Sequence, residues 1–137
     1  MEKLRIRTTR RDEMREITAQ VRDVVRRSGV REGLVLVQSL HTTAGLTVNE
    51  NADPDVVHDF LAKLARLFPR DEAYFRHAEG NSDSHLKTSF VGTTATLVVS
   101  GGDLLLGRWQ GLWLCEFDGP RERQVAVQVL ASAPAAG

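Results

Sequence analysis

The chain has only one cysteine, Cys115, so no disulfide can form within it, and its neighbours Leu114 and Phe117 predict a buried thiol. Neither sign of charge is in excess, because Lys and Arg number 18 and so do Asp and Glu, which leaves no basic field to attract nucleic acid. No apolar run approaches the about 18 residues of a membrane-spanning helix, and the first residues do not resemble a signal peptide. We therefore expect a cytoplasmic protein that binds neither nucleic acid nor membrane.

What the chain does have is the composition of a soluble globular domain. Hydrophobic residues make up 42% of its 137 residues and charged ones 26%, which excludes a mainly disordered chain. This length is enough to bury a core without disulfides or a structural metal. We expect a single domain over residues 1–137, with residues 131–137, which are only Ala, Ser, Pro and Gly, as a flexible tail.

The first half of the chain alternates between strand and helix patterns. Apolar and polar residues alternate around Leu4 and Ile6, which predicts a strand. From about Thr18 the apolar residues follow helical spacing, and Gly29 predicts the end of that helix. The apolar segment 34–40 is typical of an inner strand that is covered on both faces.

The second half begins with a well-marked helix and continues as strands. Asp53 as N-cap and Pro54 at the first helical position predict a helix that runs to about Phe68. Glycines at 101 and 102 predict a hairpin, and two further strands, 109–117 and 124–130, complete a C-terminal meander. The fold class is therefore α+β, with mainly antiparallel β-sheet layers and two principal helices.

Two helices are few for a sheet of about six strands, which is a typical sheet size. The strand that contains Trp113 is apolar on both faces, since Trp113, Cys115 and Phe117 share one face while Leu112 and Leu114 occupy the other. A second layer or a neighbouring subunit must cover what the helices leave open, so we expect an oligomer.

The segment from His77 to His85 carries the strongest chemical signal. Its nine residues include two imidazoles, two carboxylates, a carboxamide and two hydroxyl groups, and the whole chain has only four histidines. A sharp turn at Gly80 would bring both imidazoles together, and His41, at the end of a predicted strand, could complete the set. Three imidazoles with an open position commonly hold a catalytic divalent metal, here zinc or magnesium, although imidazoles also suit copper, iron and nickel.

Each of these residues also has a structural interpretation. Taken singly, His41 could equally be a strand-end residue bonded to a backbone carbonyl, and His77 could equally be a residue of a surface loop. Asp83, Ser84 and His85 are adjacent, so they cannot form the line of hydrogen bonds of a catalytic triad. Candidates for phosphate binding, each of which could equally be a strand-former or a solvated charge, are Thr42, Thr43, Lys87, Arg108 and Arg121.

Four ordered motifs resemble the YjbQ-like family, whose members are called secondary thiamine-phosphate synthases, and the resemblance extends over nearly the whole chain. They are His41–Pro54, Glu79–Lys87, Leu106–Gly111 and Cys115–Arg121. The resemblance implies a compact α+β fold, a homotrimer and a metal-binding pocket. It places the metal at His41, His77 and His85, with Glu79, Asn81 and Lys87 beside them. Together with the residues considered above, this gives His41, Glu79, His85 and Lys87 as candidates for catalysis, and Thr42, Thr43, Asn81 and Arg108 as candidates for substrate binding.

The reaction implied by the resemblance joins a pyrimidine-methyl diphosphate to a thiazole phosphate and releases pyrophosphate. The leaving group needs charge neutralisation, for which Lys87 and Arg108 are candidates, and the emerging pyrimidine cation must be kept from water. Two alternatives remain from the residues alone. One is a metal-dependent hydrolase of a small phosphorylated compound, and the other is a non-enzymatic trimer that binds a metal or an anion.

Overall fold

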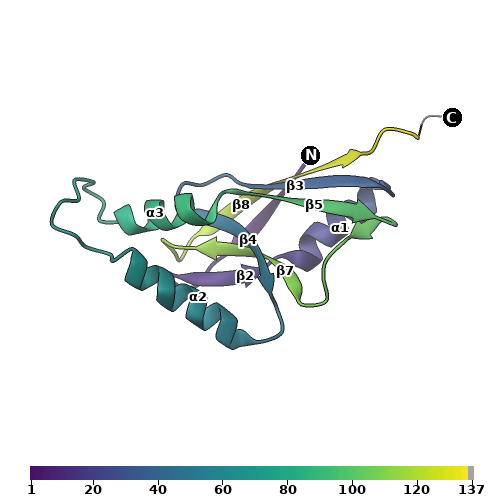
Figure 1. Cartoon of the computed structure of the whole chain (residues 1–137). Helices are drawn as coiled ribbons and strands as arrows, with labels where there is room; N and C mark the ends of the chain where they lie inside the picture. Colours follow the sequence, from purple (N-terminus) through teal and green to yellow (C-terminus); the bar gives the residue numbers. More distant parts are fainter. Residues whose placement is uncertain (136–137) are drawn as a thin grey trace.

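The structure is a computed structural model that describes residues 1–135 (Figure 1). It contains three helices, α1 (Thr18–Ser28), α2 (Pro54–Leu67) and α3 (Ser82–Val91). Its strands are β1 (Glu2–Arg7), β2 (Glu13–Glu16), β3 (Gly33–Ser39), β4 (Ala44–Glu50), β5 (Thr94–Ser100), β6 (Asp103–Leu104), β7 (Gln110–Glu116) and β8 (Glu122–Ala131). The predicted α+β class is confirmed.

The strands form two sheets in which every neighbouring pair is antiparallel. The larger sheet has the order β1-β8-β3-β5-β6, and the smaller has the order β2-β7-β4. In Figure 1 the smaller sheet lies beneath the larger one, and α2 lies below the smaller sheet. α1 lies towards the end of the molecule opposite to α3. The additional cover expected from the sequence is thus supplied, in part, by a second sheet.

The core lies between the two sheets and α1. Valines of β3, β5 and β8 meet leucines of β4 and β7, and α1 adds its apolar stripe to the same cluster. The fully buried members include Val35, Val37, Val99, Val125, Val127, Leu112, Leu114, Ile17, Val21 and Val25. α1 ends where predicted, at Gly29, whose φ of 72° is a left-handed conformation that favours glycine.

Both faces of β7 are covered, as its sequence predicts. Leu112 and Leu114 face the central core, while Cys115 and the following Phe117 pack with Leu64 of α2. Burial raises the pKa of the Cys115 thiol to about 12, so this group stays protonated at neutral pH. The helix α2 begins as predicted, because the Asp53 side chain accepts a hydrogen bond from the Asp55 amide at 2.9 Å.

The predicted C-terminal meander is wrong. β7 pairs with β2 and β4 in the smaller sheet, whereas β8 pairs with β1 and β3 in the larger one. A strand that is apolar on both faces is best buried in the middle of a sheet between other layers, so β7 takes the central position of the smaller sheet rather than a place beside β8.

The prediction that the segment 34–40 is covered on both faces is also wrong within one chain. β3 is central in its sheet, but its residues alternate, with Val35 and Val37 buried and Leu34 44% exposed. The opposite face of the larger sheet therefore carries exposed apolar side chains.

Three elements were not predicted, and one boundary was misplaced. The strands β2 and β4 were not predicted, and α3 makes three helices rather than two. β8 extends to Ala131, and the Ser132 amide donates to the Glu32 carbonyl at 2.9 Å, so the predicted tail begins later than expected. Residues 136 and 137 of that tail lie outside the described part.

No helix in residues 1–135 has the length and apolar character needed to cross a membrane.

Candidate functional site

Three of the four histidines line one pocket of about 410 Å³, which we call the histidine pocket. It lies where the loop after β3, the segment before α3 and the turn between β7 and β8 meet. Its lining includes Leu40, His41, Thr42, Thr43, His77, Glu79, Asn81, His85, Asp118, Arg121 and Arg123. The structure thus brings together most of the residues that the sequence analysis selected.

The turn at Gly80 brings the two imidazoles of the motif together. Gly80 has a φ of 70°, and the ring centroids of His77 and His85 are 5.2 Å apart at an interplanar angle of 76°. Glu79 lies beside them, with its Oε2 3.9 Å from His77 Nε2. A side chain at position 80 would strain this turn, which explains the glycine within the polar run.

His41 is held by the start of β8. Its Nε2 accepts a hydrogen bond from the Gln124 amide at 2.8 Å, and the Leu40 amide donates to the Gln124 carbonyl at 3.2 Å. Burial lowers the pKa of His41, and the nearby Arg123 charge lowers it further. The ring is therefore neutral at neutral pH, and because Nε2 accepts, the proton must be on Nδ1.

A buried ion pair forms the wall behind His41. The Arg123 guanidinium donates to both carboxylate oxygens of Glu116, and these side chains are 3% and 0% exposed. The same guanidinium donates to Thr43 Oγ1 at 2.8 Å, and Thr8 Oγ1 donates to Glu116 at 2.7 Å. Thr43 is thereby fixed at the pocket, but its hydroxyl oxygen is already engaged by the protein.

Arg121 is the cation of the pocket that a ligand can reach, since its side chain is 54% exposed. Its Nε donates to the Asp118 carbonyl at 2.7 Å and its Nη2 to Asp118 Oδ2 at 3.0 Å. Asn81 Nδ2 donates to the same carboxylate oxygen at 2.9 Å. Asp118 was not selected from the sequence, although it belongs to the motif that ends at Arg121.

Lys87 does not line the histidine pocket. Its side chain is 3% exposed, and its ammonium group donates to Asp12 at 2.9 Å and to Asp83 at 3.0 Å. Arg11 donates to both oxygens of Asp83, at 3.0 and 3.1 Å. The charge of Lys87 is thus balanced within the protein, where its ion pairs connect α3 to the segment just before β2. Its role in neutralising a leaving group stays a prediction from the sequence.

The Asp83 ion pairs predict a dependence of stability on pH. Burial alone would raise the pKa of Asp83, but the hydrogen bonds from Arg11 and Lys87 outweigh it and leave that pKa below its usual value. The stabilisation is therefore complete above about pH 4 and is lost as the pH falls through the lowered pKa. Urea unfolding between neutral and acidic pH should show this loss, and Asp83→Asn should be less stable at neutral pH with a flatter pH dependence.

Asp59→Asn is the matched control, because the Asp59 side chain is 82% exposed on α2. It should keep the wild-type dependence on pH. If Asp83→Asn and Asp59→Asn gave the same profile, the network around Lys87 would not be what fixes α3.

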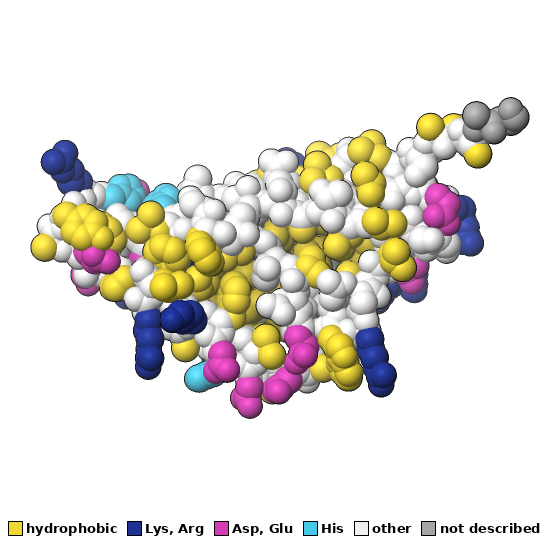
Figure 2. Space-filling view, viewed as in Figure 1, with side chains coloured by type: hydrophobic (Ala, Val, Ile, Leu, Met, Phe, Trp, Pro, Cys, Tyr) yellow, Lys and Arg dark blue, Asp and Glu magenta, His cyan; other side chains and the backbone are white. Residues whose placement is uncertain are grey.

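A second pocket of about 440 Å³, the apolar pocket, shares His77 and His85 with the histidine pocket. Its other lining residues are Phe75, Ser82 and Leu86. Figure 2 shows apolar side chains gathered beside the histidines at the α3 end of the molecule. The histidine pair thus separates a polar hollow from an apolar one, a relation that no local sequence motif shows.

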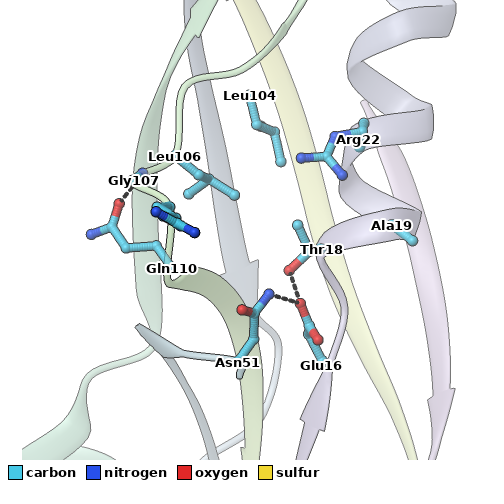
Figure 3. A pocket seen from close by; sticks show the side chains of 10 residues that line it. Glu16, Thr18, Ala19, Arg22, Asn51, Leu104, Leu106, Gly107 and Gln110 are labelled. Carbon is cyan, nitrogen blue, oxygen red and sulfur yellow. Dashed lines mark hydrogen bonds between the residues drawn. The ribbon is translucent and has the colours of Figure 1, made fainter. Parts of the chain in front are cut away.

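Arg108 lies elsewhere. It lines a third pocket together with Glu16, Thr18 and Arg22 (Figure 3). Thr43 and Asn51, at the two ends of β4, belong to the histidine pocket and to this third pocket, respectively. At about 3.3 Å per residue they are roughly 26 Å apart, so Arg108 cannot touch a small ligand in the histidine pocket of its own chain.

The three histidines are not arranged as the expected metal site requires. A ligating imidazole offers an unprotonated nitrogen, but Nε2 of His41 already accepts the Gln124 amide and Nδ1 then carries the proton. Within residues 1–135, no three His, Cys, Asp or Glu side chains are grouped closely enough to hold a metal ion. The residues as arranged do not fit three-imidazole coordination. The metal site at His41, His77 and His85 therefore stays a prediction from the sequence.

Comparison with known proteins gives a consistent result. Residues 2–132 match the family described as UPF0047 protein YjbQ-like. The chain is 45% identical over 127 residues to UPF0047 protein YugU of Bacillus subtilis, covering 93% of this chain and 96% of the relative. A YjbQ/UPF0047 family structure from Clostridium acetobutylicum superposes with a TM-score of 0.93 at 42% identity, covering 95% of this chain and 100% of that one.

The conserved hypothetical protein TT1486 from Thermus thermophilus is also similar. Its structure gives a TM-score of 0.89 at 43% identity and covers 95% of this chain and 100% of that one. The match over nearly the full chain, in sequence and in structure, agrees with the four motifs found in the sequence. The chain therefore belongs to the YjbQ-like family of UPF0047 proteins.

Proposed function

We propose that the histidine pocket and the apolar pocket together form the active site of a transferase of the thiamine-phosphate synthase type. In this reaction the nitrogen of a thiazole phosphate bonds to the methylene carbon of a pyrimidine-methyl diphosphate. The bond from that carbon to the diphosphate oxygen breaks, and pyrophosphate leaves with the bonding electron pair. The names of the similar proteins specify no reaction, so the proposal depends on the site and on the resemblance of the motifs.

The observation that carries the proposal is the shared wall of His77 and His85 between the two pockets. A substrate with an anionic end and a flat, weakly polar ring needs one polar and one apolar compartment in contact. The histidine pocket offers the guanidinium of Arg121 and the Thr42 hydroxyl to the anionic end. Phe75 and Leu86 offer an apolar surface that keeps water from the ring.

The side chains can be given separate tasks on this basis. Arg121, oriented by Asp118, stabilises the charge that develops on the leaving pyrophosphate. His41 presents its Nδ1–H as a hydrogen-bond donor, since its Nε2 is engaged by Gln124. His77 and His85 stand where the two halves of the substrate meet and can move a proton to or from the departing oxygen.

The direct test supplies the purified protein with both half-substrates. Pyrophosphate release and thiamine phosphate should appear together, and neither should appear when one half-substrate is omitted. The same assay with a chelator addresses the metal predicted from the sequence. Release of inorganic phosphate from a single half-substrate would instead indicate a hydrolase, and no turnover with either would overturn the proposal.

We also propose that the chain assembles, as a trimer, through the outer face of the larger sheet. Leu34 is opposite Val98 of β5 and Leu130 of β8, and these three side chains are 44%, 47% and 55% exposed. They form a continuous apolar row across three strands. Exposed apolar patches on a sheet are typical of protein interfaces.

Leu34→Lys should therefore dissociate the assembly, because it would place a charge in the middle of this row. Light scattering after size-exclusion chromatography should give the mass of a trimer for the wild type and that of a single chain for the variant. Leu67→Lys on α2, which is 49% exposed in the wild type, is the matched control. A monomeric wild type would contradict this assignment of the surface.

A further inference from the structure

The third pocket, at the opposite end of β4, has a volume of about 510 Å³, and we call it the arginine pocket (Figure 3). It is lined by Glu16, Thr18, Ala19, Arg22, Asn51, Leu104, Leu106, Gly107, Arg108 and Gln110. Ligand pockets for small molecules commonly have volumes of about 300–1,000 Å³. The proposed function does not use this pocket, although the motif from Leu106 to Gly111 contributes to it.

The pocket is held in shape by bonds among its own residues. Glu16 Oε2 accepts from Thr18 Oγ1 at 2.7 Å and from Asn51 Nδ2 at 3.0 Å. The Gly107 amide donates to Gln110 Oε1 at 2.8 Å, and the Gln110 amide donates back to the Gly107 carbonyl at 3.0 Å. Figure 3 shows the bonds of Glu16 to Thr18 and Asn51 and the bond between Gly107 and the Gln110 side chain.

Gly111 is the residue that allows this close approach. A Cβ at position 111 would lie 2.6 Å from Glu16 Oε2 and 3.0 Å from the side chain of Asn51. No real Cβ has so short a contact with a carboxylate oxygen, so any larger residue would displace Glu16 or Asn51. The glycine of the motif thus keeps the Glu16 and Asn51 side chains in place beside the pocket.

The charges of the pocket favour an anion. Arg22 donates through its Nε to Asp103 at 2.8 Å, and Arg26 shares the same carboxylate at 3.1 Å, so Asp103 cannot neutralise both guanidinium groups. Arg108 adds a further guanidinium, which lies 4.9 Å from the Trp109 ring and has no carboxylate partner within residues 1–135. Among the residues that line the pocket, the two guanidinium groups of Arg22 and Arg108 therefore face one carboxylate, that of Glu16, while Asp103 lies outside the lining and is shared with Arg26.

One wall of the pocket is apolar. Leu104 and Leu106 face the hollow between Arg22 and Gln110 in Figure 3. Guanidinium groups bind phosphate oxygens in pairs of hydrogen bonds, and leucine side chains pack against an organic group. We propose that the arginine pocket is a second binding site, for a small organic phosphate monoester, with the phosphate at Arg22 and Arg108 and the organic group at the two leucines.

The test is a titration of the full chain with phenyl phosphate, monitored by the backbone amide signals in two-dimensional NMR spectra. Saturating shifts are expected for Gly107 and Gly111 at the arginine pocket, and the site-resolved signals keep them apart from any shift of Gly80 at the histidine pocket. Inorganic phosphate, which has no organic group, should bind more weakly at Gly107 and Gly111. Benzoate, which has a smaller charge, should also bind more weakly there.

Arg108→Gln should weaken the binding reported by Gly107 and Gly111 about tenfold, the effect of losing one charge-assisted hydrogen bond. Arg121→Gln, in the histidine pocket, is the matched control and should leave that affinity unchanged. The proposal is overturned if Gly107 and Gly111 do not shift, or if Arg108→Gln binds as the wild type does. Neither result would bear on transfer at the histidine pocket, so the two proposals can fail separately.

Discussion

Arg123→Met will lower the free energy of unfolding by about 3–5 kcal/mol, because it leaves a buried carboxylate without its counter-charge. Glu116 is 0% exposed, and the Arg123 guanidinium is its only cationic partner among the described residues. After the change Glu116 would keep the hydrogen bonds from Thr8 and from the Asp118 amide, which cannot replace a charge. Urea unfolding monitored by circular dichroism measures the loss.

The double variant Glu116→Leu with Arg123→Met distinguishes the missing partner from a general packing defect. Removing both charges should restore much of the stability lost in the single variant, as is common when a buried ion pair is replaced by apolar residues. Arg5→Met is the surface control, since the Arg5 and Glu122 side chains are 75% and 49% exposed and should contribute little. Equal losses for Arg123→Met and Arg5→Met would contradict the burial argument.

His85→Ala will lower the turnover number for pyrophosphate release by about 10²- to 10⁴-fold, the range typical of a positioned acid or base. Its imidazole lines both pockets, so its loss removes one of the two side chains placed where the halves of the substrate would meet. The effect should fall on kcat more than on KM. Steady-state kinetics, with circular dichroism as a check on the fold, provide the measurement.

His58→Ala is the matched control, because His58 is 76% exposed on α2 and lines neither the histidine pocket, nor the apolar pocket, nor the arginine pocket. It should keep wild-type kinetics. Equal turnover in His85→Ala and His58→Ala would show that the histidine pocket does not perform the reaction. Retained binding of the half-substrates by His85→Ala would show that the loss is catalytic.

The sequence predicted those elements that short-range rules define. Asp53 caps α2 through its side chain, Gly29 ends α1, and Gly101 and Gly102 form the turn between β5 and β6, all as expected. At these positions one residue type satisfies a local backbone need. The turn at Gly80 was predicted for the same reason, and with it the approach of His77 to His85.

What escaped prediction depends on partners that are distant in sequence. α3 has no apolar stripe, because it buries Asp83 and Lys87 in ion pairs with Arg11 and Asp12, far along the chain. No periodicity could reveal this helix. Lys87 was a candidate for phosphate binding because the sequence does not show that Asp12 and Asp83 surround its ammonium group in the folded chain. Arg108 was grouped with the histidines because the sequence does not show that it lines a different pocket, at the opposite end of β4 from the histidine pocket.

The strand β4 sets which insertions the fold can tolerate. It pairs with β7 from Ala44 opposite Glu116 to Glu50 opposite Gln110, and its two ends lead into different pockets. One extra residue inside it would turn every following side chain to the opposite face and carry Asn51 away from Glu16. The part of the loop after α2 that precedes both pockets, residues 68–74, has no strand pairing within residues 1–135, so changes of length during evolution should accumulate there while the spacing from His41 to Asn51 stays constant.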